Sequence, residues 1–85
     1  MTEILAVFRS RSQAMDCNSR LRRGGIPSSL INTPKEAGVG CGLSVKFSQS
    51  TEKSARALIS GGRYSAFYGY MIVNINYGRT TFRWY

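Results

Sequence analysis

The pattern of apolar and polar positions begins with a continuous apolar segment, residues 4–8. An unbroken run of this length is typical of a strand that is buried on both faces. Ser10 follows, with Gln13 three residues later, and this spacing predicts a capping box in which the Ser hydroxyl and the Gln amide satisfy free N–H groups at a helix start. Apolar residues then recur at helical spacing, at Ala14, Cys17 and Leu21.

The predicted helix ends at two glycines, Gly24 and Gly25, one of which would take the left-handed conformation of a helix C-terminus. Pro27 forces the preceding residue toward extended geometry, so residues 28–32 are predicted to form a second strand. The first part of the chain therefore forms a strand–helix–strand unit.

The middle of the chain repeats this order. Leu43, Val45 and Phe47 alternate with polar residues, which predicts a half-buried strand. Ser50 or Thr51 can cap a second helix whose apolar residues would be buried and which would end at a second glycine pair. The expected buried residues are Ala55, Leu58 and Ile59, and the glycine pair is Gly61 and Gly62. Two strand–helix–strand units in tandem predict a split βαβ, or ferredoxin-like, two-layer α+β sandwich.

Aromatic residues are concentrated after residue 63, and two segments there, residues 71–75 and 80–84, flank Asn76-Tyr77-Gly78. Gly78 can take the positive φ that a tight turn requires, so this segment is predicted to form an aromatic β-hairpin that adds a strand to the basic four. No linker interrupts the pattern, and we expect a single domain over residues 1–85.

Composition narrows the possible functions. The 85 residues contain 12 Lys and Arg against 4 Asp and Glu, a net charge of +8, and no His. The absence of His excludes Ser/His and Cys/His catalysis and His-ligated metal sites, so we expect neither an enzyme nor a bound metal or cofactor. The acidic start and the short first apolar run do not resemble a signal peptide or a membrane span, which predicts a cytoplasmic protein with free thiols.

The segment whose residues suggest a chemical function is the glycine-rich stretch 33–42. Cys41 stands there among Gly38, Gly40 and Gly42, where an incoming group could reach its sulfur and where backbone N–H groups could favour a thiolate. Lys35 adds positive charge nearby. The alternative is that the glycines serve only the turn and that Cys41 is a small buried apolar residue.

The sequence resembles a family of very small bacterial proteins labelled selenium or sulfur carrier-like. The resemblance covers about residues 4–60 and is carried by Phe8-Arg9-Ser10, Gly25-Ile26, Thr33-Pro34-Lys35 and Cys41-Gly42-Leu43-Ser44. It implies that Cys41 is the carrier residue, that Pro34, Lys35 and Gly42 are matching loop positions, and that the partners are sulfur or selenium donor and acceptor proteins. The aromatic hairpin does not match the family pattern.

Two other functions remain open. A basic nucleic-acid-binding module could use exposed charges and rings, for which the candidates are Arg20, Arg22, Arg23, Tyr68 and Tyr70. A chain of this charge should in any case bind nucleic acid weakly and without sequence preference at low salt. The aromatic hairpin could instead serve a protein-interaction or oligomerisation domain, for example by pairing with a second copy in a homodimer.

Overall fold

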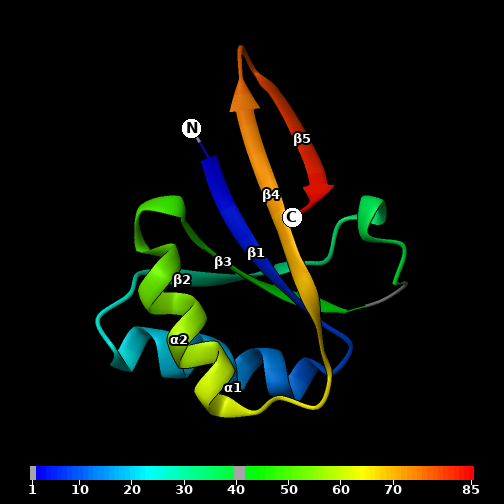
Figure 1. Cartoon of the computed structure of the whole chain (residues 1–85). Helices are drawn as coiled ribbons and strands as arrows, with labels where there is room; N and C mark the ends of the chain where they lie inside the picture. The colour runs from blue at the N-terminus through cyan, green and yellow to red at the C-terminus, as the bar shows by residue number, and fades with distance from the viewer. Residues whose placement is uncertain (1, 40–41) are drawn as a thin grey trace.

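The computed structural model describes residues 2–39 and 42–85. Its elements follow the chain in an order that matches two strand–helix–strand units and a final strand (Figure 1). The strands are β1 (Thr2–Phe8), β2 (Ser28–Asn32), β3 (Leu43–Ser48), β4 (Phe67–Asn76) and β5 (Arg79–Trp84). The helices are α1 (Arg11–Arg23) and α2 (Glu52–Gly62), with short 3₁₀ turns η1 (Lys35–Ala37) and η2 (Gln49–Thr51).

The five strands form one antiparallel sheet in the order β2-β3-β1-β4-β5. Both helices lie against the same face of this sheet, and the β4–β5 hairpin extends beyond the part that they cover (Figure 1). The α+β class and the added C-terminal hairpin agree with the sequence-based prediction.

Strand β1 is central, and its continuous apolar run is buried on both faces as predicted. Ile4, Ala6 and Phe8 belong to the larger core beneath the helices, while Leu5 and Val7 belong to a smaller core on the opposite face. All five are completely inaccessible to solvent. The sheet thus separates two apolar layers, and the second layer needs a cover other than a helix.

Helix α1 starts as predicted at Ser10, whose hydroxyl accepts a 3.2 Å hydrogen bond from the backbone N–H of Gln13. The reciprocal half of the predicted capping box is wrong. The Gln13 amide bonds forward instead, donating to Ser65 Oγ at 2.9 Å and accepting from the Ala66 N–H at 2.7 Å. Gln13 therefore links α1 to the segment before β4. Gly25 takes the expected left-handed conformation after the helix, at φ +82°.

Helix α2 differs from the prediction at both ends. Thr51 is the capping residue, but its side chain makes no capping bond and donates to the Ser48 carbonyl instead. Gly61 and Gly62 lie inside the helix, and the left-handed residue that ends it is Arg63, at φ 51°. A non-glycine residue in this conformation is uncommon, and here the chain turns at Arg63 toward the aromatic segment that leads into β4.

The β4–β5 turn contains two left-handed residues, Tyr77 at φ 50° and Gly78 at φ 76°. Two consecutive positive φ values match the twist of a tight hairpin, which confirms the predicted turn and the role of Gly78. The pairing of β1 with β4 shifts register between Val7 and Phe8, opposite Phe67 and Gly69. This irregularity places Tyr68 at a bulge and changes which side chains of β4 face the helices.

Candidate functional site

The glycine-rich segment between β2 and β3 is built around the short turn η1. The Ala37 N–H donates to the Pro34 carbonyl at 3.1 Å, and the Gly38 N–H donates to the Lys35 carbonyl at 3.0 Å. Gly38 then adopts a left-handed conformation at φ +68°, which glycine takes without steric cost. Pro34, Lys35 and Gly38 thus form one local turn that reverses the chain toward β3.

This turn covers the sheet face opposite the helices. Ala37 is only 5% exposed and belongs to the smaller core, with Leu5, Val7, Met71 and Val73. Val39 packs against the same cluster. The segment that carries the candidate chemistry is therefore held by apolar contacts on a sheet face that would otherwise be open to water.

The two ends of the segment are tied together and to β1. The Thr33 N–H donates to the Gly42 carbonyl at 3.1 Å, and the Thr33 and Ser44 hydroxyls share a 2.9 Å hydrogen bond. A Cβ atom at Gly42 would stand 2.8 Å from the carbonyl oxygen of Phe8, closer than real Cβ atoms come to backbone. Glycine is therefore required at position 42 by the close approach of β1.

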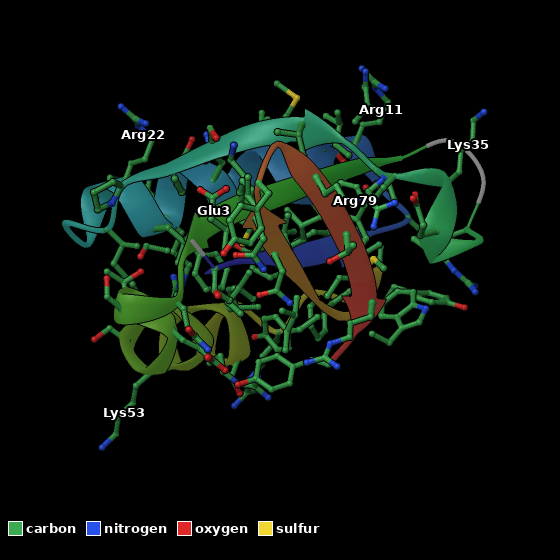
Figure 2. All side chains as sticks on the ribbon, turned by 90° about the horizontal axis from the view of Figure 1, so that it is seen from above. Glu3, Arg11, Arg22, Lys35, Lys53 and Arg79 are labelled. Atoms are coloured by element: carbon green, nitrogen blue, oxygen red, sulfur yellow. The ribbon has the colours of Figure 1, made fainter. Side chains whose placement is uncertain are left out.

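Gly40 and Cys41, the remaining two predicted site residues of this segment, lie outside the described residues. The described residues at this end of the sheet include several cations and also the acidic Glu36 of η1. Lys35 is exposed, and it lies at the same end of the molecule as Arg11, the first residue of α1 (Figure 2). Arg9 follows Phe8, the residue whose carbonyl contacts Gly42. An anion formed at this end of the sheet would meet several cations.

The other cysteine, Cys17, lies on the inner face of α1 among Ala14, Leu21 and the rest of the larger core. Its thiol is free and fully buried. Burial, reinforced by the negative charge of Asp16 and opposed by Arg20, raises the pKa of Cys17 from its ordinary value of 9.0 to about 12. This thiol stays protonated and inaccessible at neutral pH, in agreement with the predicted packing role.

Two of the three arginines predicted as nucleic-acid contacts take part in hydrogen bonds within the fold. Arg20 donates through Nε to the Leu58 carbonyl at 2.8 Å, which links α1 to α2. Arg22 donates through Nη1 to the Ser28 carbonyl at 2.7 Å. Arg23 is exposed at the end of the helix. Arg20 and Arg22 thus stabilise the junctions of α1 with its neighbours.

The two predicted tyrosines lie in different surroundings. Tyr68 is 43% exposed, with the Arg9 guanidinium 4.4 Å above its ring and the Trp84 ring 5.3 Å away. Tyr70 is half-buried against the larger core, with the Arg56 guanidinium 4.2 Å above its ring. The guanidiniums over these rings belong to Arg9 and Arg56, which were not among the predicted contact residues.

Sequence reasoning missed the anchors of the segment, namely the contacts of Ala37 and Val39 with the far sheet face and the contact of Gly42 with Phe8. An Ala-Gly-Val stretch has no period that would distinguish a packed turn from a solvated one. The small residue at position 42 was the available signal, because a glycine immediately before a strand often marks a close approach of backbone.

Within residues 2–39 and 42–85, no group of three or more acidic or cysteine side chains is placed to hold a metal ion. None of the helices in the described part of the chain is both long enough and apolar enough to span a bilayer.

The fold and the segment define a small basic α+β protein in which a Cys-Gly pair precedes β3, the neighbour of the central strand β1. The chain belongs to the family described as "Putative Se/S carrier protein-like", whose profile matches residues 3–68. The match covers β1 to the start of β4 and leaves most of the aromatic hairpin outside, as the resemblance predicted. No curated protein matches the chain.

Proposed function

We propose that this protein carries sulfur or selenium as a group bound to Cys41 and that it is not itself an enzyme. The observation that carries the proposal is the state of the other cysteine. Cys17 is fully buried and its pKa is raised to about 12, so it is unsuited to exchange groups with a partner. The sequence contains only two cysteines, which leaves Cys41 as the carrier of any thiol chemistry. Membership of the carrier-like family supports the same role.

The proposed loading step is a thiolate exchange that needs no external oxidant. The Cys41 thiolate attacks the outer sulfur of a donor persulfide, R–S–SH, and a new S–S bond forms. The donor S–S bond breaks, and the donor leaves as the thiolate R–S⁻ with the electron pair of that bond. Unloading is the same reaction with an acceptor thiolate as the attacking group. A donor of the form R–S–SeH would load selenium in the same way.

The described part of the segment supports this role in two ways. Its ends are fixed by the Thr33–Gly42 hydrogen bond and by the contact of Gly42 with Phe8, so the residue before Gly42 is attached to a defined strand start. Lys35 and Arg11 place positive charge at that end of the molecule (Figure 2). Nearby cations favour a thiolate over a thiol and also favour the persulfide anion.

We further infer that β1 to β4 with the two helices constitute a ferredoxin-like split βαβ sandwich. The order β1-α1-β2-β3-α2-β4 along the chain and the order β2-β3-β1-β4 across the sheet support this assignment. In such an arrangement the β2–β3 connection, which carries Cys41 in the sequence, is a loop at the sheet end where β1 leads into α1. A partner could reach that loop without displacing either helix.

The test is to load the purified protein with glutathione persulfide and to identify the modified cysteine by mass spectrometry of its peptides. Wild type and Cys17→Ala should each gain one sulfur atom on the peptide that contains residue 41, and Cys41→Ser should gain none. Loading of Cys41→Ser through Cys17 would contradict the proposal, as would the absence of any loading of the wild type. Selenodiglutathione, GS–Se–SG, tests selenium, since attack by Cys41 releases GS⁻ and leaves Cys41–S–Se–SG.

A further inference from the structure

A groove lies between α2 and the start of β4, on the helix side of the sheet. Its volume is about 410 Å³, which is within the range of small-molecule sites. Arg56 and Ser60 of α2 form one wall, and Arg63 stands where that helix ends. Tyr64, Phe67 and Tyr70 supply an aromatic floor. The groove is separate from the described part of the glycine-rich segment, because Ala37 and Val39 pack on the opposite sheet face.

The aromatic floor is held in place by ring contacts that continue into the core. Phe8 packs edge to face against Tyr64 and Phe67, with centroids 5.5 and 5.6 Å apart. Phe67 packs in the same manner against Tyr70 at 4.8 Å. The Tyr64 hydroxyl donates a 2.6 Å hydrogen bond to Asp16, which fixes the outer end of the row. A floor with this many contacts is ordered before any ligand arrives, which lowers the entropic cost of binding.

The described side chains that line the groove include two arginines and no acidic residue, and the acidic Glu52 and Asp16 contact lining residues from outside it. Arg56 lies over Tyr70 and also pairs with Glu52 at 3.1 Å, so its charge is partly compensated. Arg63 makes no ion pair with any acidic side chain in residues 2–39 and 42–85. Burial raises the pKa of both Tyr64 and Tyr70, so their phenols remain neutral near neutral pH and add no negative charge. A guanidinium without a partner beside neutral rings favours an anion that carries a flat apolar part.

We propose that this groove binds a nucleotide, with the base against the aromatic floor or the Arg56 guanidinium and the phosphate at Arg63. Bases stack on aromatic side chains and on guanidinium planes alike, and a guanidinium forms paired hydrogen bonds with phosphate oxygens. The Ser60 hydroxyl is an additional donor on the same wall. The shared chemistry does not distinguish a free mononucleotide from one nucleotide unit of a single strand, so the experiment must separate the two.

The experiment is a titration of the isotope-labelled full chain with AMP, followed by NMR of the backbone amides. Adenosine, inorganic phosphate and a short single-stranded oligoadenylate are the comparison probes. AMP should bind more tightly than adenosine or phosphate, and the shifted amides should cluster on α2 and the start of β4. If AMP binds about as tightly as the oligonucleotide, the ligand is a free nucleotide. Much tighter oligonucleotide binding at the same residues identifies a nucleotide unit of a strand.

Two pairs of variants make the result specific. Arg63→Gln should weaken AMP binding about tenfold or more, because a charged hydrogen bond to phosphate is lost. Arg23→Gln removes the same charge from α1, which contributes no side chain to the groove, and should change the affinity less than about twofold. Tyr70→Leu should weaken binding about fivefold or more through lost stacking, while Tyr70→Phe should not.

The proposal is overturned if AMP does not bind, if phosphate binds as well as AMP, or if Arg63→Gln and Arg23→Gln weaken binding equally. In the last case the interaction is general electrostatics of a basic chain. Loading of Cys41 is measured independently, so the failure of nucleotide binding and the failure of the carrier function are distinguishable.

Discussion

Gly42 approaches the end of β1 so closely that a Cβ atom at this position would stand 2.8 Å from the carbonyl oxygen of Phe8. The atom on the other side of the contact belongs to the backbone of the central strand, which is hydrogen-bonded on both edges. Neither partner can move without disturbing the sheet. This contact fixes the end of the segment that carries the proposed carrier cysteine, and it explains why the cysteine is followed by glycine.

Gly42→Ala should therefore lower the free energy of unfolding by about 1–3 kcal/mol, the usual cost of forcing extra atoms into a packed site. Urea denaturation measures the change. Gly61→Ala is a matched control, because its added Cβ would meet only the flexible end of Arg20 at 3.1 Å, and alanine favours a helix interior. Equal losses in the two variants would show that the contact with Phe8 is not the cause.

Gln13 provides a second test of the packing between the two halves of the chain. Its side-chain amide bonds to Ser65 and to the Ala66 backbone, 52 and 53 residues away in sequence. Gln13→Ala should cost about 1–2 kcal/mol of stability, because the half-buried Ala66 N–H loses its acceptor. Gln49→Ala, at an exposed position of η2, should be almost neutral in the same thermal denaturation experiment. A neutral Gln13→Ala would mean that water replaces the amide without loss.

The faces of the sheet could be predicted from the sequence because alternation is a local property. Leu43, Val45 and Phe47 all face the larger core, as their spacing indicated. The first helix was predicted equally well, since Ser10 and the paired glycines act within a few residues of themselves. The end of α2 was not, because the helix continues through Gly61 and Gly62, where it was expected to end, and the left-handed residue that follows it is Arg63.

Contacts between residues that are far apart in the sequence could not be predicted from local patterns. The bulge between β1 and β4 sends Tyr68 toward Trp84 and Tyr70 toward the larger core, although the two residues share a spacing that places both on one face of a regular strand. The groove beside α2 brings Arg56 together with Tyr70, which requires the fold itself. The basic and aromatic run from Arg63 to Phe67 can be read from the sequence. The packing of α2 beside it, which forms the wall of the groove, cannot.

The raised pKa of Cys17 predicts a dependence of stability on alkaline pH. Above about pH 9 the unfolded chain releases the Cys17 proton, while the folded chain retains it until about pH 12. Stability should therefore fall across this range by up to about 1.4 kcal/mol per pH unit for this one proton. Cys17→Ala lacks this contribution, so its stability should fall less steeply under reducing conditions. Parallel curves for the two proteins would contradict the burial of the thiol.

Lys35 tests the electrostatic part of the carrier proposal. Lys35→Met keeps most of the aliphatic bulk and removes the charge, so the pKa of Cys41 should rise. The rate of alkylation of Cys41 as a function of pH, read from its own peptide by mass spectrometry, gives this value directly. Lys53→Met removes an equal charge at the opposite end of the molecule (Figure 2) and should leave the profile unchanged.

The same pair of variants separates a local effect from a change in net charge. If Lys35 stabilises the thiolate through its position, transfer from glutathione persulfide should slow in Lys35→Met alone, and high salt should reduce the difference from wild type. The two variants should also unfold at similar temperatures, because both lysines are exposed. If both variants shift the profile equally, the charge of the whole chain controls the thiol. If neither does, the thiolate is favoured by groups other than Lys35, namely the arginines at that end of the molecule or backbone N–H groups.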